Sequence, residues 1–125
     1  SMASENKVLA HPACVDSIPS SANQEDFVSM GTTAARKAGT ILENTRSVLA
    51  FELLTACQAI DIRRMIGSYG KGLSPVGEAV FNHVREKVAF MGQDRELWPD
   101  IQVVEAMVRS GELLELAESI VPDLM

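Results

Sequence analysis

A long stretch with helical periodicity runs from about residue 32 to residue 64 of this sequence. The stretch contains no proline, and small or apolar residues recur in it at intervals of three and four. A helix of this length spans about 50 Å at 1.5 Å per residue, far more than the average globular helix. The recurring residues form two neighbouring stripes: Ala34, Ala38, Ile41, Thr45, Val48 and Glu52 in one, and Ala35, Leu42, Leu49, Leu53, Ala56 and Ile60 in the other.

The two halves of this expected helix differ in polarity. Residues 32–47 carry several charges, so one face of the helix should be exposed to solvent, whereas residues 48–60 are apolar on nearly every side. A helix that is apolar all round is normally buried all round, and a chain of 125 residues has little material to cover it. We therefore expect partner helices from other subunits or from a longer protein to cover residues 48–60. The chain alone is expected to associate into a dimer or tetramer.

The first residues lack a clear period. Ser1 and Met2 are interpreted as a remnant of cloning, and residues 3–22, which include Pro12 and Pro19, as an irregular segment. The helical part is expected to cover residues 23–125.

Further helices are predicted beyond the long one, after a glycine-rich connection at 67–73. Ser74-Pro75 is typical of a helix start, and the helix should run to about residue 90. Trp98-Pro99-Asp100 opens another helix that Gly111 ends, and residues 112–120 form the last one. No stretch alternates in the manner of a strand, so the predicted fold class is all-α.

Composition excludes several functions. The net charge is −6 and the basic residues are scattered, which disfavours binding to nucleic acid or to an anionic membrane. The most apolar window is too short to cross a bilayer, and no secretory signal is recognised, so we expect a cytoplasmic protein. Cys14 and Cys57 are expected to be reduced, buried thiols, although a disulfide between them stays open. The spacing of cysteines and histidines predicts no metal site.

One polar cluster, Asn23-Gln24-Glu25-Asp26, precedes the long helix. It has two interpretations. Asn23 could cap a helix whose first turn holds the other three residues, where acids suit the helix dipole. Alternatively, a carboxylate held rigidly at a helix start could contact a cationic or proton-donating substrate.

A series of motifs bears on this choice: His11-Pro12-Ala13, Val15-Asp16-Ser17-Ile18-Pro19, Ser21-Ala22-Asn23-Gln24-Glu25-Asp26, Val28-Ser29-Met30-Gly31, Glu43-Asn44-Thr45-Arg46, Val48-Leu49-Ala50, Glu52-Leu53, Ala56-Cys57-Gln58-Ala59 with Asp61 and Arg63, Ser74-Pro75, Pro99-Asp100-Ile101 and Arg109-Ser110-Gly111. Together they resemble the carboxy-terminal part of the histidine ammonia-lyases, in the family of aromatic amino-acid lyases. The resemblance covers residues 10–112 or so and is densest up to residue 63.

The resemblance implies a large, mostly helical homotetramer in whose central bundle the long helix lies. It implies that the parent enzyme converts L-histidine to trans-urocanate and ammonia. The electrophile of such enzymes is methylidene-imidazolone, which forms from an internal Ala-Ser-Gly. This chain contains no Ala-Ser-Gly. We therefore expect a fragment with no cofactor of its own and no activity alone.

The resemblance also assigns roles within the cluster. Glu25 matches a catalytic, substrate-binding glutamate that faces the imidazole of the substrate, Gln24 supports it, and Asn23 and Asp26 act as caps. Related lyases that act on phenylalanine resemble this chain but have Gln at the matching position, so Glu25 favours histidine. Two alternatives stay open: a fragment of a phenylalanine or tyrosine ammonia-lyase or aminomutase, and a helical oligomerisation module without chemistry.

Overall fold

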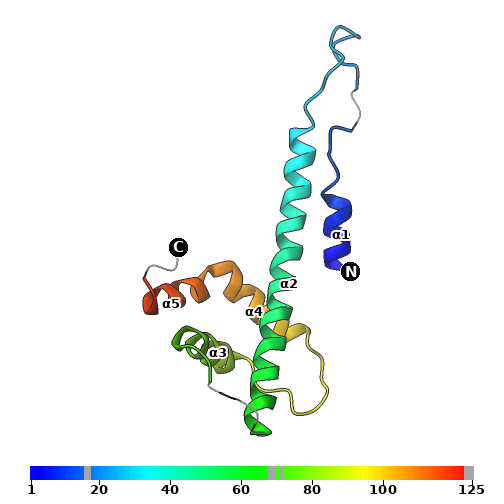
Figure 1. Ribbon diagram of the computed structural model, residues 1–125. Coiled ribbons are helices and arrows are strands. Elements are labelled where there is room, and N and C mark those ends of the chain that lie inside the picture. Colours follow the sequence, from blue (N-terminus) through cyan, green and yellow to red (C-terminus); the bar gives the residue numbers. More distant parts are fainter. Residues whose placement is uncertain (16–17, 68–69, 71, 123–125) are drawn as a thin grey trace. The chain divides into compact units, whose positions relative to one another are not determined.

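The computed structural model describes residues 1–15, 18–67, 70 and 72–122. Its helices are α1 (Met2–Leu9), α2 (Gly31–Met65), α3 (Pro75–Lys87), α4 (Trp98–Ser110) and α5 (Glu112–Ile120), shown in Figure 1. The described residues contain one isolated β-bridge and no β-strand, so the all-α expectation is confirmed. Asp16 and Ser17, and part of the predicted connection 67–73, lie outside the described residues.

Helix α2 covers 35 residues, Gly31–Met65, and its periodicity predicts a helix over residues 32–64, so the prediction is confirmed to within one residue at each end. Its threonines fit the helix by donating their hydroxyls to carbonyls four residues earlier, as Thr45 does to Ile41 at 2.7 Å and Thr55 to Phe51 at 2.7 Å. Arg63 and Arg64 stand in the last turn, where positive charge suits the helix dipole.

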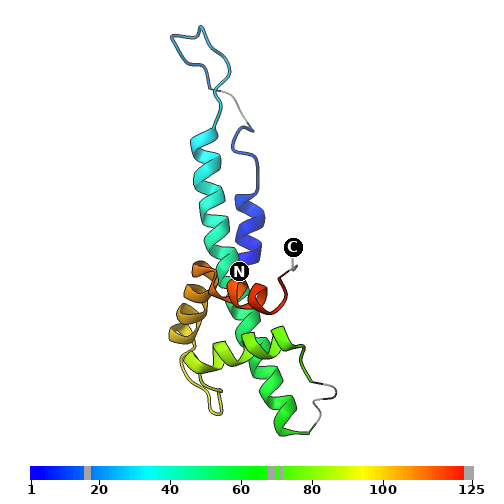
Figure 2. The ribbon, with the colours of Figure 1, turned by 90° about the vertical axis from the view of Figure 1, so that its left-hand side faces the viewer.

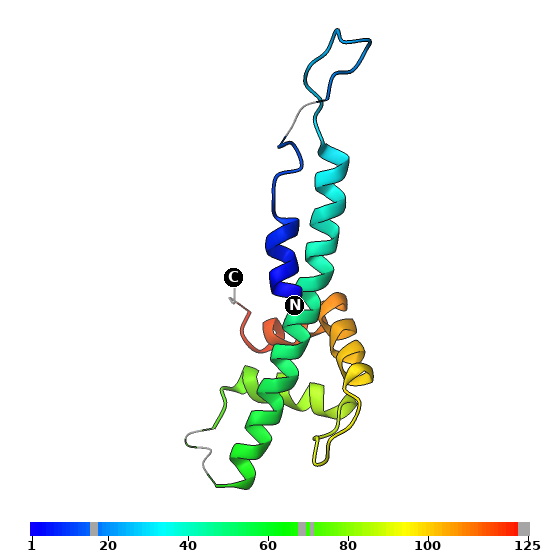
Figure 3. The same ribbon diagram turned by 90° about the vertical axis from the view of Figure 1, so that its right-hand side faces the viewer.

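Contacts divide the chain into two compact units, Ser1–Val48 and Leu49–Met125. In the first unit α1 lies alongside the opening turns of α2 (Figures 1 and 3). Asn44 Nδ2 donates to Asn6 Oδ1 at 3.0 Å and to Glu5 Oε2 at 3.3 Å. The expectation of an irregular segment from residue 3 is therefore wrong for the residues of α1. Eight residues are too few to predict from periodicity, and side-chain contacts with α2 supply the stability that a short helix lacks.

The second unit holds the hydrophobic core, where α3, α4 and α5 gather around the later turns of α2 (Figure 2). Val84, Val104 and Met107 are almost completely buried. Leu53, Leu54, Ile60, Leu73 and Leu113 pack around the core. The buried residues of the core are Ala50, Cys57, Phe81, Val84, Val88, Ile101, Val104 and Met107.

The predicted helix boundaries in this unit are largely confirmed. Ser74 caps α3 by accepting a hydrogen bond from the backbone N–H of Gly77 at 3.1 Å. Gly111 ends α4 with φ of 84°, a left-handed conformation that glycine adopts without strain. Helix α3 ends at Lys87, before the expected residue 90, because the guanidinium of Arg85 takes up the carbonyls of Val88 at 3.1 Å and Ala89 at 3.4 Å.

The apolar part of α2 is only partly covered within its own unit. Ala50 and Cys57 are buried, whereas Leu49 is 45% and Phe51 42% exposed. In the described part of the chain, no helix has the length and hydropathy of a membrane span.

Candidate functional site

Gln24 and Glu25 lie in a tight turn on the segment that joins α1 to α2. The turn is closed by the isolated bridge between Ser20 and Glu25. The N–H of Ser20 donates to the Glu25 carbonyl at 2.8 Å, and the N–H of Glu25 to the Ser20 carbonyl at 3.2 Å. The Ser20 hydroxyl lies 3.2 Å from Oε2 of the Glu25 carboxylate. One residue therefore holds both the backbone and the side chain of Glu25.

The backbone inside this turn is left-handed at three consecutive residues. Ser21, Ala22 and Asn23 have φ of 52°, 56° and 67°, and in the described part of the chain they are the only non-glycine residues with positive φ. Each such conformation costs about 1–2 kcal/mol for a residue with a Cβ. The expectation that Asn23 to Asp26 start a helix is therefore wrong, because left-handed residues cannot continue into a right-handed helix. The turn character of Pro19 followed by small residues and Asn is the signal that could have indicated this.

The side chains of the predicted site are open to solvent. Gln24, Glu25 and Asp26 are all exposed. Within the described residues Ser20 is the hydrogen-bond partner of the Glu25 carboxylate, and it engages Oε2. The other oxygen, Oε1, is in a position to accept a hydrogen bond from a ligand, as a carboxylate oxygen does readily.

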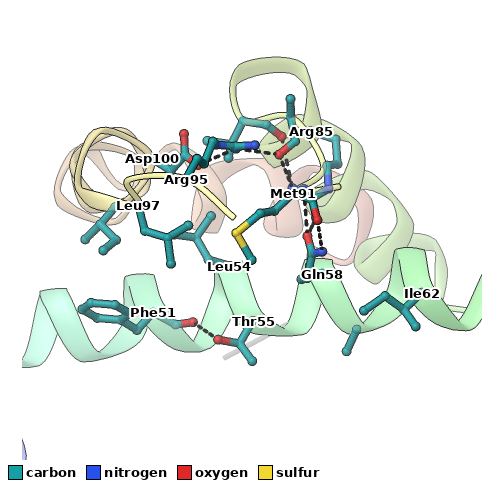
Figure 4. Close-up of a pocket in the computed structure, with 14 residues that line it drawn as sticks. Phe51, Leu54, Thr55, Gln58, Ile62, Arg85, Met91, Arg95, Leu97 and Asp100 are labelled. Atoms are coloured by element: carbon teal, nitrogen blue, oxygen red, sulfur yellow. Dashed lines mark hydrogen bonds and ion pairs between the residues drawn. The ribbon is translucent and has the colours of Figure 1, made fainter. Parts of the chain in front are cut away.

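A second candidate is an apolar cavity of about 300 Å³ in the second unit. Figure 4 shows side chains of α2 along one side of it, with Phe51, Leu54, Thr55, Gln58 and Ile62 labelled. The opposite side comes from α3, from the start of α4 and from the segment between them.

The polar groups of this cavity hold the segment between α3 and α4 in place. Gln58 pairs with the backbone of Met91 in both directions, donating to its carbonyl at 2.9 Å and accepting from its N–H at 3.2 Å (Figure 4). Arg95 donates to the carbonyl of Ala89 at 3.1 Å and to Asp100 at 2.6 Å. These groups are engaged with the protein itself, so the cavity presents an apolar surface and no free reactive group. The sequence alone gave no sign of this arrangement.

The two histidines lie in different units. His11 is exposed, and its carbonyl accepts a hydrogen bond from Lys37. His83 on α3 has Nε2 at 3.4 Å from Oε1 of Glu112, and Lys87 binds the same oxygen at 2.8 Å. The hydrogen bond from Lys87 is the main cause that lowers the pKa of Glu112. Among the described residues, no group of His, Cys, Asp or Glu is arranged to hold a metal ion.

The cysteines differ from expectation in one respect. Both are free thiols, and Cys57 is buried as expected, but Cys14 is exposed. The prediction of a buried Cys14 is wrong because the segment that carries it has no covering element within the first unit.

Comparison with known proteins finds close similarity to a family of enzymes. The chain is 53% identical over 120 residues to the histidine ammonia-lyase of Symbiobacterium thermophilum, covering 96% of this chain and 23% of that protein. It is 54% identical over 124 residues to the histidine ammonia-lyase of Natranaerobius thermophilus, covering 99% of this chain and 24% of that protein. The chain therefore spans less than a quarter of the length of these relatives.

Solved structures agree with these matches. The histidine ammonia-lyase of Trypanosoma cruzi superposes with a TM-score of 0.86 at 41% identity, covering 98% of this chain and 23% of that one. A tyrosine aminomutase from Streptomyces globisporus superposes with a TM-score of 0.83 at 37% identity, covering 99% of this chain and 22% of that one. The family model described as aromatic amino acid lyase matches residues 1–86, more than half of the chain. This chain belongs to the aromatic amino acid lyase family.

Proposed function

We propose that this chain is part of a histidine ammonia-lyase, an enzyme that converts L-histidine to trans-urocanate and ammonia. The observation that carries the proposal is the carboxylate of Glu25, exposed on a braced turn, in a chain about half identical to histidine ammonia-lyases. The placement of this stretch toward the carboxy-terminal end of such an enzyme stays a prediction from the sequence.

Glu25 is the proposed contact with the substrate's side chain. A carboxylate accepts hydrogen bonds only, and the imidazole of histidine offers an N–H to it. This bond orients the ring, and the carboxylate can also accept a proton during the reaction. Gln24, beside it, provides an amide that supports the bound ring. A benzene ring in the same place would leave the carboxylate buried and unpaired, which argues against phenylalanine.

The electrophile of the reaction does not come from this chain. Methylidene-imidazolone requires Ala-Ser-Gly, and the triplet is absent from these 125 residues. The chemistry of ammonia removal is supplied by residues outside this stretch, while Glu25 and Gln24 bind and orient. The 125-residue chain is accordingly proposed to release no ammonia alone.

The proposed assembly is a homotetramer in the cytoplasm. Exposed apolar side chains on the later part of α2, such as Leu49 and Phe51, support subunit contacts there. Free thiols support a reducing compartment.

A second candidate substrate is tyrosine, because a tyrosine aminomutase is among the similar structures. A phenol O–H can also donate to a carboxylate, so Glu25 does not by itself exclude it.

A substrate panel tests the proposal. The whole protein that contains this chain is offered L-histidine, L-tyrosine and L-phenylalanine separately, with the 125-residue chain as control. Ammonia, the unsaturated acid and any β-amino acid are measured. We expect urocanate from histidine alone and nothing from the chain. Coumarate, cinnamate or a β-amino acid would overturn the histidine specificity, and ammonia from the isolated chain would overturn its proposed inactivity.

A further inference from the structure

We propose that Ser20 is the positioning residue for Glu25: its hydroxyl fixes one carboxylate oxygen so that the other faces the substrate. This inference rests on the proposed function and adds a residue to that site. Two backbone hydrogen bonds and one from the Ser20 hydroxyl to Oε2 join Ser20 and Glu25.

The backbone conformation of the turn supports a functional role for it. Ser21, Ala22 and Asn23 are all left-handed, although none of them is a glycine. Strain of this kind persists only where the surroundings over-determine it, and it concentrates at functional sites. No residue from Ser20 to Glu25 is buried, so core packing does not hold the turn. Hydrogen bonds hold it instead: those between its two ends, and one inside the turn from the N–H of Gln24 to the Ser21 carbonyl at 3.1 Å.

The two oxygens of the Glu25 carboxylate have different surroundings. Ser20 engages Oε2 at 3.2 Å, whereas Oε1 has no hydrogen-bond partner among the described residues. A carboxylate tied at one oxygen loses rotational freedom about its last torsion before a ligand arrives. The substrate then meets an acceptor that already has its orientation, and less ordering is needed on binding.

The hydroxyl, and not the backbone of Ser20, makes the contact that mutation can remove selectively. Ser20→Ala keeps the bridge, because both backbone hydrogen bonds remain available, and loses only the bond to Oε2. Ser20→Thr keeps a hydroxyl. Ser29→Ala is the matched control, since Ser29 is exposed on the same segment and its hydroxyl makes no hydrogen bond with the described residues.

The experiment is a double-mutant cycle in the whole protein, measured as kcat/KM with whichever amino acid of the panel it deaminates. We expect Ser20→Ala to lower kcat/KM about tenfold, and Ser20→Thr and Ser29→Ala to stay within about threefold of the unmodified protein. In a Glu25→Gln background, Ser20→Ala should change kcat/KM by less than about twofold, because Ser20 acts through Glu25. Thermal melting checks that each variant is folded.

Two results would overturn the inference: full activity of Ser20→Ala, or a loss on Ser20→Ala that is undiminished in the Glu25→Gln background. A purely structural role gives the second result. A crystal structure of the whole protein decides the geometry without activity, and a Glu25 carboxylate turned away from the Ser20 hydroxyl would also overturn the inference. If no amino acid yields ammonia, the proposed function fails, and that structure still decides whether Ser20 holds Glu25.

Discussion

At the scale of single residues, Arg85 makes several stabilising contacts that no pattern in the sequence indicates. Its Nε donates to Asp61 Oδ2 at 2.7 Å, and both side chains are largely shielded, 14% and 21% exposed. The same guanidinium satisfies the carbonyls of Val88 and Ala89 just past the end of α3. It therefore joins α2 to α3 and also terminates α3.

Replacement of Arg85 should be costly. Ala in its place would leave the Asp61 carboxylate without its partner and the Val88 carbonyl without this donor, while Arg95 still donates to the Ala89 carbonyl. We expect this change to lower the free energy of unfolding by about 2–3 kcal/mol. Arg63→Ala, at an exposed position of α2, should change it by less than about 0.5 kcal/mol. Urea unfolding of the three proteins measures the difference, and equal effects of the two substitutions would contradict the assigned role of Arg85.

The thiol of Cys57 gives a pH-dependent prediction. Burial raises the pKa of Cys57, Arg85 opposes the rise and Asp61 adds to it. The neutral thiol is thus the form that the folded chain prefers. Its contribution to stability is complete below the ordinary thiol pKa of about 8.5 and is lost as pH rises through the higher pKa of the folded state.

The free energy of unfolding should therefore fall less between pH 7 and pH 10 in Cys57→Ala than in the unmodified chain. Cys14→Ala, which removes the exposed thiol, should keep the full alkaline decline. If the free energy of unfolding of Cys57→Ala fell with pH as steeply as that of the unmodified chain, the buried thiol would have no part in the fall.

At the scale of helices, the clearest local device is the cap of α3. The Ser74 hydroxyl accepts the N–H of Gly77, which would otherwise lack an intrahelical partner, and Pro75 follows at the first helical position. Ser74→Ala should lower the free energy of unfolding by about 1 kcal/mol. Ser4→Ala, at an exposed position of α1, is the control and should have almost no effect. A shift in the urea midpoint no larger than that of the control would refute the cap.

Helices were predictable from the sequence where periodicity or end signals were strong. The boundaries of α2 follow from its repeated apolar positions, and those of α4 and α5 from Pro99 and from Gly111. The sequence wrongly predicts a helix start at the turn before α2, because Asn23 and the acids after it suit a cap as well as a turn. The deciding factor was the pairing of Ser20 with Glu25, a contact that sequence periodicity does not encode.

The candidate site was predictable to a similar degree. Glu25 and Gln24 could be named from motifs alone, but the hydrogen bonds from Ser20 to Glu25 depend on three consecutive left-handed residues, of which only Asn23 has a propensity for that conformation. The roles of Gln58 and Arg85 around the second-unit cavity were equally hidden, because they arise from contacts between separate elements.

At the scale of the whole molecule, the exposed apolar side chains of α2 predict self-association. Leu49 is 45% and Ile62 44% exposed, so the described residues of the second unit cover them only in part. We expect the 125-residue chain to sediment as a dimer or tetramer, since contact between copies removes this surface from water. Leu49→Lys combined with Ile62→Lys should shift it toward monomer, whereas Gln102→Lys, at an exposed position of α4, should not. A monomer for the unmodified chain at micromolar concentration would contradict the expectation.

The proposed role of Glu25, to bind the histidine ring through its carboxylate, can be checked by one comparison in the whole protein. Histidine turnover is compared between the whole protein and its Glu25→Gln variant, with Glu96→Gln, an exposed glutamate, as the matched control. Loss of a charge-assisted hydrogen bond to the imidazole should lower kcat/KM about 10- to 100-fold in Glu25→Gln, with melting temperature and subunit assembly retained. Turnover by Glu25→Gln equal to that of the control would remove Glu25 from the reaction.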